Sequence, residues 1–314
     1  LRRPRMSRIF YRGKLYDYPL KPLNALRNLG LLEAARCVLS YGWARVRPPA
    51  DQTTLEGYIA GQFGWRLYEH FFKTYNEKVW GVPASELSAD WGAQRIKGMS
   101  LFQAVWEPIR AGLVGRRRSK QRQVTSLIDQ FNYPKYGPGQ MWERCAEIVT
   151  GRGARLIFNA RVTGIAHRDG AAHTVTALVD GVEQTFPCTA VISSMPFGAL
   201  VNAMTPAAPE TVRRAASGLT YRDFMTVALV VPLDYSFPDN WIYIHDPAVK
   251  VGRIQNFGSW SPYLVKEGRT CLGLEFFVNE GDTLWTKSDA ELIAQAKREL
   301  HHLGLGDATR VEAG

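Results

Sequence analysis

The chain has 314 residues, 46% of them hydrophobic, and a formal net charge of +10. This length and apolar content suffice for one large domain or two medium ones. No apolar run reaches the roughly 18 residues that a membrane-spanning helix needs, and no signal-peptide pattern opens the sequence. The composition therefore does not favour a membrane-spanning protein.

Cysteine and charge distribution bear on location and partners. Four cysteines lie far apart without metal-ligand spacing, namely Cys37, Cys145, Cys188 and Cys271. This favours a reducing, cytoplasmic setting without a disulfide framework. Basic residues gather at the N-terminus and in the run RRRSKQR at 116–122. Such a run is typical of a solvated loop, and contact with an anionic substrate or a membrane surface is the alternative.

The first elements are a short strand pair and a basic helix. The sequence opens without Met inside a basic segment, which suggests a fragment of a longer protein. Residues 11–14 predict a tight turn between two strands. Residues 20–47 carry apolar side chains at three-to-four spacing, which predicts an amphipathic helix that Pro48 ends. This pattern favours burial against the same domain, and contact with a membrane surface or a partner stays open.

A second helix is predicted over 55–71. Apolar residues recur there every four positions, after the capping-box pair Thr53 and Glu56. Residues 101–114 form a weaker apolar segment. The first 130 residues are therefore expected to be mostly helical after the strand pair.

An aromatic and basic turn follows the second helix. Tyr75, Lys78 and Trp80 precede Gly81, and Ser88 is placed to cap a further helix. A turn that carries Tyr, Lys and Trp between two helices can wall a polar pocket with aromatic faces. A helix–loop–helix corner with an ordinary core Trp fits the same residues.

Residues 133–196 change to one helix and several strands. A loop rich in Pro and Gly leads into a helix with an apolar face. Strands are predicted over 155–158, 161–166, 173–179, 183–187 and 190–193. Asp169-Gly170 and Asp180-Gly181 supply hairpin turns. The segment AVIS at 190–193 is apolar and suits a buried sheet.

The last third is again mainly strand. Strands are predicted over 224–231, 241–244 and 270–278. A helix over 288–303 follows, with Ser288 and Glu291 as a capping box.

One predicted strand has a polar face. Arg253 and Gln255 alternate with apolar residues, so on a strand they share one side, and Asn256 follows them. This face suits the wall of a substrate pocket, and an exposed strand face is the alternative. Glu275 lies in an otherwise apolar strand, where a buried carboxylate needs a partner, and Arg253 could serve.

Several kinds of site lack support in the residues. A dinucleotide-binding turn needs G-x-G-x-x-G between a strand and a helix. The nearest string, at 151–156, lacks the third glycine and follows a helix. No nucleophile motif or metal-ligand spacing occurs. Basic residues are not interleaved with aromatics as in nucleic-acid-binding proteins. We therefore expect no metal site and no nucleic-acid partner, and we identify no catalytic residue.

The turn at 75–81 resembles a known family. The pattern Y-x-x-K-x-W-G, followed by R-I, resembles the helical substrate region of the FAD-dependent amine oxidase and protoporphyrinogen oxidase superfamily. It is equally similar to the matching region of UDP-galactopyranose mutase, where it lines the sugar-nucleotide site. The matching residues are Tyr75, Lys78, Trp80, Gly81, Arg95 and Ile96. The expected substrate-binding residues are Tyr75, Lys78, Trp80 and Arg95, together with Arg253 and Asn256 from the polar strand.

Two later segments resemble cofactor-contacting parts of the same superfamily. GARLIFNARV, 153–162, resembles a segment in which the backbone of the Val contacts the adenine of FAD, which implies Val162. AVISSMP, 190–196, resembles the D-x-V-I-x-x-x-P strand that passes the cofactor, which implies Ser194, Met195 and Pro196. Thr189-Ala190 stands where the family has an acidic residue.

The resemblance spans most of residues 1–280 and implies the fold. An α/β plus α+β architecture is expected: a two-domain, glutathione-reductase-like flavoprotein of which this chain is an internal fragment. Residues 1–132 would be the mainly helical part of the substrate domain. Residues 133–200 would be the middle segment of the FAD-binding domain. Residues 201–314 would be the substrate-domain sheet and the following helix.

The implied function is that of an FAD-dependent oxidoreductase of the amine oxidase or protoporphyrinogen oxidase type, acting on a small molecule. The alternative is a UDP-galactopyranose mutase-like isomerase. The mutase pattern R-I-P-V-R has a second Arg that pairs the diphosphate, and here Lys97 replaces the Pro and Met99 the second Arg. Lysine lacks the bidentate geometry of arginine, which favours the oxidoreductase.

The chain alone is not expected to hold FAD tightly or to be active. The pyrophosphate needs a glycine-rich turn at a helix N-terminus, and the sequence has none. Strands that lack this unit would leave apolar surface uncovered, which favours self-association.

Overall fold

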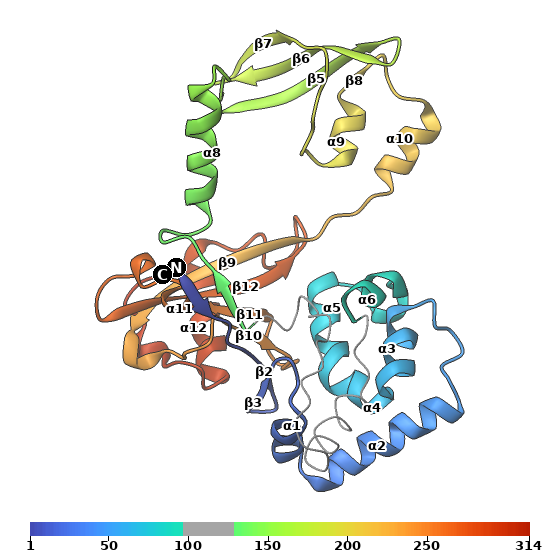
Figure 1. The fold of residues 1–314 in the computed structure, drawn as a ribbon, viewed down its shortest axis with the longest axis vertical. Helices are drawn as coiled ribbons and strands as arrows, with labels where there is room; N and C mark the ends of the chain where they lie inside the picture. The colour runs from blue at the N-terminus through green and yellow to red at the C-terminus, as the bar shows by residue number, and fades with distance from the viewer. Residues whose placement is uncertain (97–128) are drawn as a thin grey trace, which may run out of the picture. The chain divides into compact units, whose positions relative to one another are not determined.

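The computed structural model describes residues 1–96 and 129–314, in two units (Figure 1). One unit comprises residues 1–138 and 222–314, and the other comprises residues 139–221. The positions of Lys97 and Met99, the apolar segment 101–114 and the basic run 116–122 lie outside the described residues.

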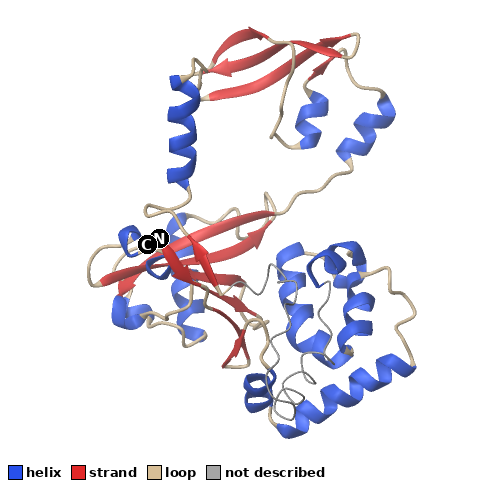
Figure 2. Ribbon diagram, viewed as in Figure 1, coloured by secondary structure: helices blue, strands red, loops and turns tan. Residues whose placement is uncertain are grey.

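The first unit is built on a six-stranded sheet in the order β3-β2-β10-β11-β12-β9. Figure 2 shows the strands in red and the helices in blue. Its strands are β2 (Ser7–Tyr11), β3 (Lys14–Asp17), β9 (Asp223–Pro232), β10 (Trp241–Ile244), β11 (Val251–Asn256) and β12 (Arg269–Val278). Neighbours are antiparallel, apart from β10 and β2, which pair in parallel. The predicted N-terminal strand pair is confirmed, and it joins the sheet formed by the last third of the chain.

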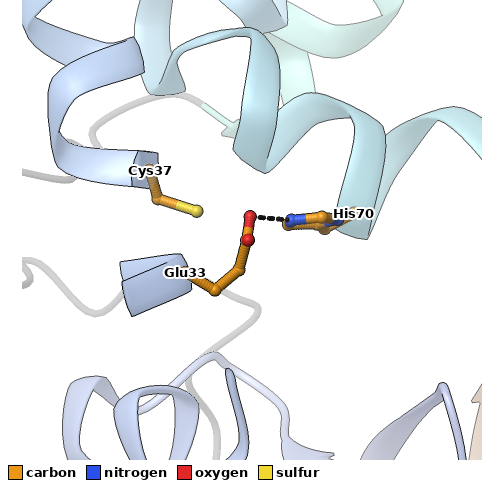
Figure 3. A group of neighbouring side chains, drawn as sticks. All are labelled: Glu33, Cys37 and His70. Atoms are coloured by element: carbon orange, nitrogen blue, oxygen red, sulfur yellow. Dashed lines mark hydrogen bonds and ion pairs between the residues drawn. The ribbon is translucent and has the colours of Figure 1, made fainter. Parts of the chain in front are cut away.

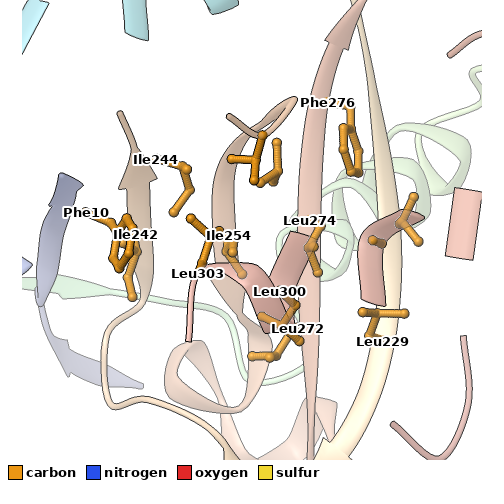
Figure 4. Packing of buried hydrophobic residues seen from close by; sticks show 14 of the residues in the cluster. Phe10, Leu229, Ile242, Ile244, Ile254, Leu272, Leu274, Phe276, Leu300 and Leu303 are labelled. Carbon is orange, nitrogen blue, oxygen red and sulfur yellow. The ribbon is translucent and has the colours of Figure 1, made fainter. Parts of the chain in front are cut away.

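One face of this sheet forms an apolar core with the last helix. Ile242, Ile254 and Leu274 are fully buried, and Leu300 of α12 (Asp289–His302) packs against the same cluster (Figure 4). Burying a side chain of this size contributes about 1.5–3 kcal/mol. The predicted capping box of α12, Ser288 with Glu291, is confirmed. Because successive residues of a strand point to opposite faces, the residues between these core positions lie on the other side.

The helices of the first unit break where glycine takes a positive φ. The predicted helix over 20–47 is two helices, α1 (Pro22–Leu29) and α2 (Leu31–Val46), separated by Gly30 with φ 84°. The predicted helix over 55–71 breaks in the same way at Gly64, also with φ 84°. A Cβ at Gly64 would lie 2.7 Å from the backbone nitrogen of Tyr41, so the close approach of α2 also requires glycine there.

The helices after residue 53 lead into the aromatic turn. They are α3 (Leu55–Phe63), α4 (Trp65–Tyr68), a π-helical turn η1 (Glu69–Lys73), α5 (Thr74–Trp80) and α6 (Ala89–Ile96). The N-cap of α3 is Thr54, whose side chain accepts from the backbone of Gly57, so the predicted capping pair was one residue early. Ser88 accepts from the backbone N–H of Asp90, 3.2 Å away, in the first turn of α6, as its predicted capping role requires.

Shorter elements complete the first unit. A two-stranded pair joins β1 (Arg2–Pro4) to β4 (Gln130–Asn132). The others are the helix α11 (Phe257–Trp260) and the 3-10 turns at Ala84–Glu86, Leu233–Tyr235, Pro262–Leu264 and Ala308–Arg310. Among the described helices, none is both long and apolar enough to cross a bilayer.

The second unit carries a separate sheet in the order β7-β6-β5-β8. Its elements are α8 (Gly139–Gly151), β5 (Ala160–Arg168), β6 (Ala171–Val179), β7 (Val182–Pro187), α9 (Phe197–Asn202), β8 (Met204–Thr205) and α10 (Glu210–Ser217). Both predicted hairpin turns are confirmed, with positive φ at Asp169, Gly170, Asp180 and Gly181. This sheet shares no strand with the six-stranded sheet of the first unit.

Two predicted strands of the second unit are not strands. Residues 155–158 and 190–193 are extended or bent but pair with no strand among the described residues. Their apolar side chains face solvent, and Ile192 is fully exposed. Helix α8 likewise buries none of its residues. The predictions of strands over 155–158 and 190–193, and of a buried sheet position for 190–193, are therefore wrong, because a strand forms only beside a partner strand.

Candidate functional site

The face of the large sheet opposite its apolar core is polar and aromatic. Tyr243 of β10 pairs with Arg253 of β11, and Arg253 pairs in turn with Glu275 of β12. In the neighbouring rung, Trp241 pairs with Gln255. We call these five residues the polar sheet face.

A buried carboxylate anchors this face. Glu275 is 1% exposed, and its two oxygens accept hydrogen bonds from Arg253 Nε and Gln255 Nε2. The predicted pairing of Glu275 with Arg253 is therefore confirmed. The side chain of Arg253 is 32% exposed, and its Nη groups have no hydrogen-bond partner among the described residues. Arg253 thus neutralises Glu275 and still presents two NH2 groups, which carry four N–H donors, at the surface of the sheet.

Tyr75 from α5 adds to the aromatic part of this face. Its ring stacks on His245, with 5.1 Å between centroids, and meets Tyr243 edge-on at 5.3 Å. Burial raises the pKa of the Tyr75 hydroxyl, so it stays neutral at physiological pH. Of the predicted substrate residues, Tyr75 and Arg253 are brought together on one face.

Lys78 has a structural task instead. Its Nζ donates to the backbone carbonyls of Asp246, Val251 and Ile244, at 2.6, 3.1 and 3.3 Å. Burial lowers the pKa of Lys78 to about 8. An ammonium has three protons, and all three are engaged, so none remains for a ligand. The prediction that Lys78 binds substrate is corrected: it ties α5 to the loop between β10 and β11.

Asn256 also serves the fold. Its side-chain nitrogen donates to Phe237 O at 2.5 Å, while its oxygen accepts from Thr270 Oγ1 at 2.6 Å and from Gly258 N at 3.2 Å. It is buried and caps α11. The polar side chain of Asn256 is there to cap a helix, so Asn256 is not part of the candidate site.

Trp80 keeps a free donor. Its ring meets Trp91 of α6 edge-on at 5.1 Å, and its buried Nε1 has no partner among the described residues. A buried indole N–H without an acceptor is unusual in the core of a folded protein. Arg95 lies in α6, and its side chain is outside the described part of the chain.

Sequence reasoning missed three aromatic members of this region. Trp241 stacks on Trp260 with 5.3 Å between centroids and an interplanar angle of 16°, and the guanidinium of Arg5 lies 5.5 Å from the Trp241 ring. Tyr243 and His245 contact Tyr75 as described above. The alternation W-I-Y-I-H at 241–245 carried the signal, because it places the aromatic residues on the face opposite two isoleucines.

The predicted cofactor residues come from two separate segments of the second unit, β5 and the stretch before α9. Val162 is half-buried in β5, beside a shift in the register with β6. Ser194 and Pro196 are exposed, Met195 is half-buried, and Pro196 precedes α9. Exposed main chain at 190–194 can reach a ligand by backbone groups, but these residues supply no glycine-rich turn for a pyrophosphate.

A second polar cluster lies among the helices (Figure 3). Glu33 and Cys37 of α2 and His70 of η1 bring three potential metal-ligating atoms within 4.8 Å of one another. Protein partners already engage the carboxylate of Glu33 and both ring nitrogens of His70. Glu33 accepts from Arg66 and lies 2.9 Å from His70 Nε2, while His70 Nδ1 lies 2.8 Å from the Tyr11 hydroxyl. Hydrogen bonds from Arg66 and His70 lower the pKa of Glu33 to about 2, and burial raises the pKa of Cys37 to about 11. We interpret the cluster as an ion-pair network that joins α2 to η1.

A surface depression of about 350 Å³ lies elsewhere, along the β1–β4 pair. Arg2, Gln130, Phe131 and Asn132 line it. It has a single charged side chain and is open to solvent. Its residues offer no acid–base or aromatic constellation, so we do not place the site there.

Comparison with known proteins relates this architecture to flavoproteins. A family model described as flavin containing amine oxidoreductase matches residues 66–313. The fold is similar to that of reduced UDP-galactopyranose mutase, with a TM-score of 0.76 and 18% identity over 97% of this chain and 63% of the mutase. It is also similar to a protein described as a protoporphyrinogen oxidase of Exiguobacterium sp. 255-15, with a TM-score of 0.66 and 14% identity over 99% and 66% of the two chains. Wild-type putrescine oxidase bound to putrescine gives a TM-score of 0.54 at 15% identity over 100% and 67%. The chain thus spans about two thirds of the length of each of these structures.

Proposed function

The chain belongs to the flavin containing amine oxidoreductase family, and we propose that it carries the substrate-binding part and a portion of the cofactor-binding part of an FAD-dependent oxidoreductase. The observation that carries this proposal is the polar sheet face. An antiparallel sheet often leaves a polar second face in solvent, but here that face holds Glu275 at 1% exposure, paired with Arg253 and Gln255. Polar groups set among aromatic side chains are typical of small-molecule sites.

We assign the two units to the two expected domains. The first unit is proposed as the substrate domain, with helices and the large sheet, and the second as the middle segment of a glutathione-reductase-like FAD-binding domain. The exposed main chain at 190–194 and the half-buried Val162 fit contact with the adenine end of FAD through backbone groups. The pyrophosphate would be held by a glycine-rich βαβ unit in polypeptide outside these 314 residues.

Four residues have a stated task in this proposal. Bound FAD would supply hydride acceptance, and the protein would supply binding, orientation and exclusion of water. Tyr75 and Tyr243 would pack against the apolar part of a substrate. The Nη groups of Arg253, which have no partner in the described part of the chain, would donate to a carbonyl or anionic group, and the Trp80 indole would donate to a second acceptor. None of these groups is assigned as a general acid or base.

A second candidate function rests on the likeness to the mutase and on Arg253. An aromatic platform beside a guanidinium fork would also suit a sugar nucleotide, whose base stacks and whose diphosphate accepts bidentate donors. In this case reduced flavin would act without net oxidation of the substrate.

Substrate-driven bleaching of the flavin separates the two functions. A longer protein that contains this chain would be purified with FAD and mixed anaerobically with amines, a porphyrinogen or UDP-galactopyranose. An oxidoreductase loses its oxidised flavin absorbance on addition of its substrate alone. A mutase leaves oxidised flavin unchanged and interconverts the sugar nucleotide only after chemical reduction. Isomerisation by reduced flavin without any substrate-driven bleaching would refute the oxidoreductase.

A further inference from the structure

Helix α2 turns its large apolar side chains to solvent and its small ones to the protein. Leu32, Leu39, Trp43 and Val46 are 68%, 73%, 57% and 77% exposed. The buried residues of this helix are Cys37 and Ala44. Helices at the surface of a domain normally bury their larger apolar residues. The expectation that this stripe is buried against its own domain was therefore wrong, because the periodicity defines a stripe without saying which side is covered.

The exposed residues form one continuous surface, which we call the outer face of α2. It consists of Leu31, Leu32, Val38, Leu39, Trp43 and Val46. At 3.6 residues per turn, these positions fall within an arc of about 140° around the helix axis. Exposed apolar surface gathered on one element in this way marks an interaction site rather than scattered surface residues.

Arginines border the outer face on both sides. Arg36 and Arg47 follow it on one edge of the arc and Arg45 on the other, and all three are exposed. The Arg47 guanidinium lies 5.4 Å from the Trp43 ring centroid, so cation and indole already stand side by side. An apolar arc flanked by cations, with an aromatic residue at its border, is the arrangement of helices that lie in the interface of a membrane.

We propose that the outer face of α2 docks on an anionic membrane surface. The apolar arc would sink about 5–10 Å into the headgroup region, and the three arginines would extend to lipid phosphates. A second copy of the chain fits less well, because a two-fold contact through this face would bring the arginines of both copies together. None of the described helices is able to cross a bilayer, so the contact would be peripheral.

Flotation of the purified chain with vesicles tests this proposal. Vesicles of phosphatidylcholine alone would be compared with vesicles that also contain phosphatidylglycerol. We expect the protein to float with the anionic vesicles, to be released by salt because the cationic contacts are screened, and to stay behind with the neutral ones. Equal binding to both kinds of vesicle, or to neither, would overturn the proposal.

Matched variants assign the binding to α2. Trp43→Asp is expected to reduce vesicle binding by more than tenfold, whereas Trp142→Asp, at a 66% exposed tryptophan of α8, should leave it unchanged. Arg45→Gln and Arg47→Gln should each weaken it about fivefold, and Arg152→Gln on the second unit should not. Both tryptophan positions are exposed, so the variants should keep the wild-type circular dichroism. Equal losses for Trp43→Asp and Trp142→Asp would contradict the assignment. So would a vesicle-independent dimer that Trp43→Asp dissociates, because the occupant would then be a second copy.

Discussion

Replacing Arg253 with Met should destabilise the first unit more than any loss of a surface charge. The substitution leaves the Glu275 carboxylate, 1% exposed, with Gln255 as its one remaining donor among residues 1–96 and 129–314. Removing one partner of a buried ion pair costs about 3–5 kcal/mol, because the other charge stays buried and uncompensated. Arg253 itself is 32% exposed, so solvent screens part of the attraction and we expect the lower end, about 3 kcal/mol. For a unit of this size that corresponds to a fall in Tm of about 6–12 °C.

Urea unfolding of three variants measures this cost. Arg253→Met is compared with the double variant Arg253→Met/Glu275→Gln, which removes the stranded charge and should recover most of the loss. Arg269→Met is the matched control, because its pair with Glu312 is exposed on both sides and is worth at most about 1 kcal/mol. If Arg253→Met is no less stable than Arg269→Met, Glu275 is not the buried anchor that we describe.

Three further predictions concern other parts of the chain. Lys78→Met should cost about 2 kcal/mol because three carbonyls lose their donor, and an unchanged stability would refute the tether. Because burial lowers the pKa of Lys78 from 10.5 to about 8, the stability of wild type relative to this variant should rise with pH between these values, and a parallel pH dependence would contradict the lowered pKa. The pKa of Glu33 is lowered from 4.5 to about 2, so its contribution to the free energy of unfolding is present above pH 4.5 and is lost as pH falls toward 2. In Glu33→Gln the stability should therefore fall less steeply with acid over that interval, and an unchanged pH dependence would count against the network. The chain of 314 residues should not retain FAD through dialysis, because a few hydrogen bonds of about 1 kcal/mol each cannot offset the roughly 4–15 kcal/mol cost of association, and stoichiometric FAD would disprove this.

Local chemistry made part of the fold predictable. The turns at Asp169-Gly170 and Asp180-Gly181 adopt positive φ at both positions, which these residue types accept, and the hairpins follow from that. The capping box fixed the start of α12, because the Ser288 side chain accepts from the backbone of Glu291 and the Glu291 side chain accepts from the backbone of Ser288. The helix breaks at Gly30 and Gly64 were not predictable in this way, because the apolar period runs through both glycines. Glycine is required at Gly64 because the backbone of Tyr41, in another helix, lies too close for a Cβ.

Some residues of the candidate site could likewise be predicted from the local sequence, and others depend on contacts that are distant in the sequence. Arg253 and Glu275 could be paired from the sequence, because a carboxylate in an apolar strand needs a cation and alternation placed Arg253 on a polar face. The structural role of Lys78 could not be predicted, since its hydrogen-bond partners lie 166 to 173 residues away in the sequence. Tyr243 was missed because a strand of four residues does not reveal which face a distant helix will cover.

Substrate affinity in the reductive half-reaction tests the central claim most directly. In the longer, FAD-containing protein, Trp80→Phe keeps the ring contact with Trp91 but removes the unpartnered Nε1 donor, and Tyr75→Ala removes an aromatic wall of the polar sheet face. Stopped-flow bleaching of the flavin gives the substrate Kd and the limiting reduction rate separately. We predict a Kd raised about fivefold or more by Trp80→Phe, from the loss of about 1 kcal/mol, and a larger rise for Tyr75→Ala. Trp65→Phe, at a ring in contact with Tyr68, should leave Kd unchanged. Unaltered Kd in Trp80→Phe and Tyr75→Ala, with the flavin still reduced by substrate, would place the substrate elsewhere and contradict the account.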